Sequence, residues 1–217
     1  MIDRDIMISE IIRISKIHPS RVFNIFLFGS RVYGTASDKS DYDIIMVANN
    51  SVESTEIKHP IYNIHIYTPD KFKEDLDWHR INNIECILAP EWAKLKEDIK
   101  YELSIDSNKL RHSISHISSN SWVKSKKKLT IGDIDEYQVG VKSLFHSIRI
   151  PMFASHIIKY GNIDYSCANY IWDQINSRKW TWDELDDKYR VLYNITMSKF
   201  REDNGLTSFI HKRKRVK

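Results

Sequence analysis

The sequence is poor in cysteine, glycine and proline, and each shortage excludes a class of protein. Its 217 residues include two cysteines, Cys86 and Cys167, without a CxxC spacing, which excludes a disulfide framework and a zinc-finger pattern and favours a reducing cytoplasm. Six glycines and five prolines exclude collagen-like and low-complexity chains. No apolar run approaches the roughly 20 residues that span a bilayer, and the acidic start MIDRDIMISEI is unlike a signal peptide. We therefore expect a soluble cytoplasmic protein without a membrane partner.

Positive charge is concentrated at one end of the chain. The last seven residues, 211–217, read HKRKRVK and hold five of the 33 Lys and Arg residues, whereas the rest of the chain is nearly neutral. This distribution argues against a protein that coats nucleic acid over its whole surface. For the basic tail two interpretations stay open, contact with an RNA or DNA molecule and a solubilising end.

The hydrophobic pattern divides the chain into an α/β half and a helical half. Apolar β-branched and aromatic runs predict three strands, at 22–28, 41–47 and 61–67. Helical spacing predicts helices at 5–17, 101–117, 135–160, 165–176 and 182–200, with 118–129 as a polar, basic connection or the opening of the next helix. From Asp70 onward no further strand is expected. The predicted fold is an α/β (α+β) domain with a short mixed sheet, residues 1–100, then an α-helical bundle, residues 101–210, and the basic tail at 211–217.

The segment FLFGSRVYGTASDKSDYDIIMV, residues 26–47, carries the most specific pattern in the chain. Two apolar strands enclose six polar or glycine positions at fixed spacing: Gly29, Ser30, Gly34, Ser40, Asp41 and Asp43. This arrangement resembles the signature of the DNA polymerase beta-like nucleotidyltransferase superfamily, G-S-x-x-x-G, a spacer, then S-D-x-D before apolar residues. The resemblance implies nucleotide binding at Gly29, Ser30, Arg31 and Ser40, and catalysis and metal binding at Asp41 and Asp43.

Each residue type in this pattern suits that chemistry. Asp41 and Asp43 lie two positions apart on a strand, so both carboxylates project from one face and can share a divalent metal, Mg²⁺ or Mn²⁺. Such ions bind carboxylates together with water and substrate phosphates. Gly29 permits close backbone approach, Ser30 offers a hydroxyl and backbone N–H groups to a phosphate, and Arg31 adds a permanent positive charge.

The third predicted strand departs from the family pattern. Active relatives usually place a third carboxylate on it, whereas IYNIHIYT contains no acid and offers Asn63 and His65 instead. Neither replaces a carboxylate as general base without cost. The departure favours an alternative function, a catalytically silent nucleotide-binding sensor or an antitoxin-like partner of the same fold.

The helical half holds a second candidate feature. Lys142, His146 and Arg149 fall at i, i+4 and i+7 on one face of the predicted helix, and helical bundles in this superfamily often contribute a cation to the triphosphate. Two alternatives stay open: this face of the helix is simply solvated, or the cations that bind the triphosphate come from Lys126–Lys128. The segment around Glu85 and the stretch KSLFHSIRI are similar to small bacteriophage-type nucleotidyltransferases, which implies the host cytoplasm for a phage-encoded protein.

Together these features predict a Mg²⁺-dependent nucleotidyltransferase with its active site in the cleft between the two domains. It would move a nucleoside monophosphate from an NTP such as ATP to an acceptor hydroxyl, on RNA or tRNA, a protein or a small molecule, with release of pyrophosphate. A weaker third hypothesis is an RNA-binding protein that works through its tail.

Overall fold

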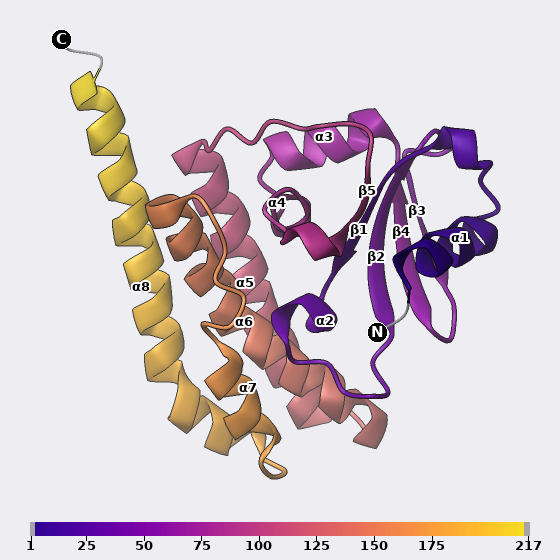
Figure 1. The fold of residues 1–217 in the computed structure, drawn as a ribbon. Helices are drawn as coiled ribbons and strands as arrows, with labels where there is room; N and C mark the ends of the chain where they lie inside the picture. The colour runs from indigo at the N-terminus through magenta and orange to yellow at the C-terminus, as the bar shows by residue number, and fades with distance from the viewer. Residues whose placement is uncertain (1–2, 215–217) are drawn as a thin grey trace. The chain divides into compact units, whose positions relative to one another are not determined.

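The computed structural model describes residues 3–214, without the side chains of residues 134, 135 and 206–214. The chain forms two compact units, one up to Ser104 and one from Ile105 (Figure 1). Among the residues described, no helix is long and apolar enough to cross a membrane.

A five-stranded mixed sheet is the centre of the first unit. Its strand order is β3-β4-β2-β1-β5, in which β2 and β4 are parallel and the other neighbours are antiparallel. The strands are β1 (Val22–Phe28), β2 (Tyr42–Ala48), β3 (Ser54–Lys58), β4 (Tyr62–Tyr67) and β5 (Lys94–Glu97). The predicted fold class, an α/β domain with a short mixed sheet before a helical region, is confirmed.

The sequence-based interpretation missed both edge strands. The edge strand β3 reads STEIK and is largely exposed, and β5 reads KLKE and has one buried residue, Leu95. Short, charged edge strands carry little of the apolar signal by which a strand is recognised, because one of their sides is open to water. The expectation of no strand beyond Asp70 was therefore wrong.

Helices cover both faces of the sheet (Figure 1). On one face Phe26, Ile45 and Val47 pack with Phe72 of α3 (Pro69–Asp77) and Cys86 of α4 (Ile81–Ile87). On the other face lies α1 (Arg4–Ser15), where Glu10 accepts a 2.8 Å hydrogen bond from the Tyr62 hydroxyl. Burial and this carboxylate raise the pKa of Tyr62 to about 12. Period-two alternation along β4 thus leaves Asn63 and His65 on the α3 and α4 face.

The second unit contains the helices α5 (Ser107–Ile131), α6 (Ile134–Tyr160), α7 (Asn169–Asn176) and α8 (Trp182–Lys214). The predicted connection at 118–129 is wrong, because these residues continue α5. Within 118–129 the buried residues are Ser118, Trp122 and Ser125, and the Ser118 hydroxyl donates a 2.6 Å hydrogen bond to the Ser147 carbonyl of α6. Serine on a buried helix face allows two helices to pack closely. In the sequence, however, a stretch rich in serine has the composition of a polar loop.

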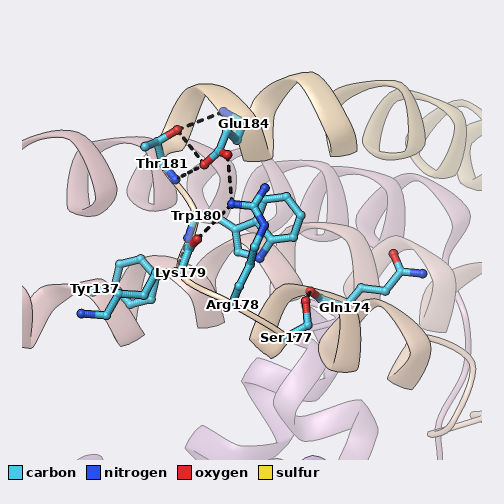
Figure 2. Close-up of polar contacts among 8 residues, drawn as sticks. All are labelled: Tyr137, Gln174, Ser177, Arg178, Lys179, Trp180, Thr181 and Glu184. Atoms are coloured by element: carbon cyan, nitrogen blue, oxygen red, sulfur yellow. Dashed lines mark hydrogen bonds and ion pairs between the residues drawn. The ribbon is translucent and has the colours of Figure 1, made fainter.

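The turn into α8 is held by a reciprocal cap (Figure 2). The Thr181 hydroxyl accepts from the Glu184 backbone N–H at 3.3 Å, and the Glu184 carboxylate accepts from the Thr181 N–H at 2.8 Å. Before the cap, the Arg178 guanidinium stacks 3.6 Å from the centre of the Trp180 ring, and the backbone N–H of Trp180 donates to the Tyr137 hydroxyl. The helix then runs to Lys214, well past the predicted end at 200. Of the predicted basic tail, residues 211–214 continue α8, and 215–217 lie outside the described residues.

Candidate functional site

The close approach of Gly29 to Asp43 is the tightest feature of the motif. Gly29 connects β1 to the short helix α2 (Ser30–Tyr33) with φ 77° and ψ −156°, a conformation that belongs almost entirely to glycine. A Cβ atom at this position would lie 2.2 Å from Oδ2 and 2.9 Å from Cγ of Asp43. The Asp43 carboxylate therefore lies directly against the Gly29–Ser30 turn, which explains why the motif has glycine there.

The two motif carboxylates differ in how they are held. Asp43 lies inside β2, opposite Phe28 of β1 and Asn63 of β4, and is half-buried. Asp41 directly precedes β2 and is exposed. Since the two residues are two positions apart in extended chain, their side chains project to the same face, as the sequence predicts.

Arg31 connects α2 to the segment that carries Asp41. Its Nη2 donates to the carbonyl of Ser40, its Nε donates to the carbonyl of Asp41 at 3.3 Å, and its guanidinium carbon lies 3.8 Å from the centre of the Tyr42 ring. Ser40 closes the preceding turn, because its hydroxyl accepts from the Ser37 N–H at 3.0 Å. Both residues thus organise the backbone around Asp41.

The position beside Asp43 on β4 is neutral, but an acid lies one strand further out. Asn63 Nδ2 donates to His65 Nε2 at 3.3 Å, and Asn63 Oδ1 is buried without a hydrogen-bond partner in the described part of the chain. Glu56 of the missed strand β3 is in register with His65, with 3.8 Å between Oε1 and Nε2. Burial lowers the pKa of His65; Glu56 opposes this effect and Lys58 adds to it. No sequence signal marked Glu56, because its strand was not recognised.

Two carboxylates suit a hard divalent cation that completes its shell with water and substrate. In the described residues, no three His, Cys, Asp or Glu side chains gather as a ready metal site. Mg²⁺ is commonly held by one or two carboxylates plus substrate phosphates rather than by a closed protein cage. Asp41 and Asp43 fit this mode of binding, and the amide oxygen of Asn63 adds a neutral oxygen donor next to Asp43.

A buried contact anchors α2 from its other end. The Tyr33 hydroxyl donates to the Glu85 carboxylate of α4, and both side chains are buried. Glu85, noted in the sequence for its likeness to small nucleotidyltransferases, thus contacts the helix that follows Gly29.

In the second unit, the predicted cations of α6 gather around His146. Lys142 is exposed, His146 is half-buried, and Arg149 is buried with its guanidinium carbon 4.5 Å from the centre of the Phe153 ring. Arg149 Nη2 donates to His146 Nδ1 at 3.1 Å. Burial, followed by the charges of Arg149, Lys142 and Lys124, lowers the pKa of His146 well below its ordinary value. Lys124 of α5 was not singled out in the sequence, whereas Lys128, part of the competing cluster, pairs with Glu136.

Comparison with known proteins identifies the family. Residues 8–115 match the family described as nucleotidyltransferase domain. A solved structure of a nucleotidyltransferase-like protein from Exiguobacterium sibiricum 255-15 is 12% identical, with 96% of this chain and 79% of that chain covered and a TM-score of 0.33. Among curated proteins, none matches the sequence. The matched residues contain the whole Gly29 to Asp43 motif and the sheet that holds it, and this part of the chain is therefore a DNA polymerase beta-like nucleotidyltransferase domain.

Proposed function

We propose that the protein transfers a nucleoside monophosphate from an NTP to an acceptor hydroxyl and releases pyrophosphate, with Mg²⁺ or Mn²⁺ bound by Asp41 and Asp43. The observation that carries the proposal is the Asp43 carboxylate against the Gly29–Ser30 turn, with Asp41 on the same face. This arrangement places the two carboxylates next to the backbone amides at the start of α2, so a metal bound by the acids and a phosphate bound by the amides would be neighbours.

The residues of this chain would contribute mainly by positioning. Asp41 and Asp43 hold the cation, which when bound activates the attacking hydroxyl and neutralises charge on the phosphates. Gly29 and Ser30 contact the phosphates through backbone N–H groups and the serine hydroxyl, since the first amides of a helix lack partners within it. Most of the rate enhancement in such transfers comes from orientation and electrostatic stabilisation.

We also propose that the face of α6 with Lys142, His146 and Arg149 serves the triphosphate, through direct contact of the exposed Lys142 and, at longer range, through the charge of Arg149, which is 3% exposed. Their support is the accumulation of positive charge around His146, to which Lys124 adds. The triphosphate carries the negative charge of the substrate and is therefore the part that such a positive potential attracts most. Lys142→Ala is expected to raise the KM for NTP and leave kcat less affected, because Lys142 is exposed and its loss removes charge without opening a cavity.

A second function is supported by the neutral position on β4. With Asn63 rather than an acid beside Asp43, the site has one carboxylate fewer than active relatives. A nucleotide-binding sensor or antitoxin-like partner would bind NTP and leave it intact. The two functions are separated by whether NTP is consumed in the presence of Mg²⁺.

The acceptor is tested by labelling. The protein is incubated with Mg²⁺ and each α-labelled NTP in a cell lysate, which is then separated into RNA, protein and small-molecule fractions. Label in one fraction identifies the acceptor class, and Asp41→Asn should abolish it. Asp38→Asn is the matched control, because Asp38 is an exposed acid in the same loop. NTP binding without label in any fraction supports the sensor.

A further inference from the structure

Arg31 lies next to the predicted phosphate-binding turn, yet its described contacts are with the protein itself. It directs two guanidinium N–H groups at the carbonyls of Ser40 and Asp41 and stacks on the ring of Tyr42. Three consecutive residues of one segment are thus bound by one side chain from another segment. A guanidinium is suited to this task, because its planar fork donates in two directions while its face stacks on an aromatic ring.

The contacts of Arg31 matter because Asp41 is the less supported of the two carboxylates. Asp43 is held by ladder pairing on both sides and by the Gly29 turn. Asp41 lies outside β2 and is exposed, at the end of a turn closed by Ser37 and Ser40. Its carbonyl and that of Ser40 are bound by Arg31, which ties Asp41 to α2 and therefore to the Gly29–Ser30 turn.

We propose that Arg31 is a positioning residue that fixes Asp41 for metal binding, rather than a cation for the substrate phosphates. This inference rests on the proposed function, in which Asp41 and Asp43 share the metal. It replaces the role that the sequence motif assigns to Arg31. The Tyr33 to Glu85 contact holds the other end of α2, so the short helix is fixed at both ends.

Arg31→Lys and Arg31→Gln separate the two roles. Lysine keeps the positive charge but loses the fork and most of the stacking, so it preserves phosphate binding and not the hold on Asp41. If Arg31 positions Asp41, both variants lower kcat and raise the Mg²⁺ concentration for half-maximal rate, each by about tenfold or more, since misplacing a reacting group by 1 Å costs about 10²-fold. The KM for NTP should change less than twofold in both.

Two further measurements keep the inference testable if the protein turns over no NTP. Amide hydrogen exchange across residues 37–43 should become faster in both variants, and Mn²⁺ affinity, followed by electron paramagnetic resonance, should fall, as we also expect for Asp41→Asn. A wild-type Mg²⁺ requirement and kcat in Arg31→Lys, with a raised KM for NTP in Arg31→Gln, would overturn the inference. Unchanged exchange at 37–43 in both variants would also overturn it. Failure of the proposed function gives a different result: Asp41→Asn, with Arg31 intact, would then bind Mn²⁺ as well as the wild-type protein does.

Discussion

Replacing Gly29 by alanine should disable the site by moving one carboxylate. The new Cβ atom would lie 2.2 Å from Asp43 Oδ2, whereas ordinary contact begins at 3.4 Å, so the carboxylate must retreat by about 1.2 Å. A displacement of that size predicts about a 10²-fold loss of Mg²⁺-dependent turnover. Since φ is +77° at Gly29, alanine also strains the backbone, by about 1–3 kcal/mol of unfolding free energy.

Gly161→Ala is the matched control for this prediction. Gly161 ends α6 with φ 71°, and a Cβ there meets nothing within 4 Å. Alanine should cost about 1–2 kcal/mol from backbone strain alone and leave turnover unchanged. Urea unfolding and pyrophosphate release measured on the three proteins compare the effects. A folded Gly29→Ala protein with wild-type turnover and Mn²⁺ affinity would refute the argument that Asp43 is positioned by this turn.

Three further predictions concern other parts of the molecule. Asn63→Asp adds an acid in register with Asp43, and should lower the Mg²⁺ concentration for half-maximal turnover; an unchanged requirement would show that this position does not face the metal. The pKa of His146 is depressed in the folded protein, so below pH 6.5 the unfolded chain binds a proton that the folded chain does not. The free energy of unfolding should therefore fall as the pH decreases, by at most about 1.4 kcal/mol per pH unit for this one group. His146→Gln should reduce that slope in urea unfolding between pH 7.5 and 5.5, and an identical slope would contradict the stated cause. Thr181→Ala removes the cap of α8 and should cost about 1 kcal/mol in the same assay, with turnover retained.

The centre of the site was predictable because its signal is local. The apolar residues up to Phe28 indicate strand β1, which ends before Gly29 and Ser30. Asp41 and Asp43 lie at the start of the next strand, and all these residues fall within 26–47. The period of a strand then places both carboxylates on one face without any knowledge of the rest of the chain. The contact between Gly29 and Asp43 follows once these two strands pair.

The features that escaped prediction depend on neighbours distant in sequence or on polar residues that are buried. Glu56 comes beside His65 only through the pairing of an exposed edge strand, and such strands lack an apolar pattern. Ser118 is fully buried in a helix–helix contact, although its neighbourhood reads as a loop. The contacts of Arg31 required the turn geometry at Ser40, which residue types alone do not specify. For Arg149, helical spacing indicated a polar face, but its side chain is 3% exposed and stacks on Phe153.

Transfer of a nucleoside monophosphate that depends on Asp41 and Asp43 can be followed by the fate of two labels. The protein is incubated with Mg²⁺, the lysate fraction that accepts the label, fluoride to inhibit pyrophosphatase, and an NTP labelled on either the α or the γ phosphate, alongside Asp41→Asn and Asp38→Asn. We expect the α label to join an acceptor and the γ label to leave in pyrophosphate, with both events lost only in Asp41→Asn. Release of the γ label as inorganic phosphate, or full transfer by Asp41→Asn, would contradict this expectation.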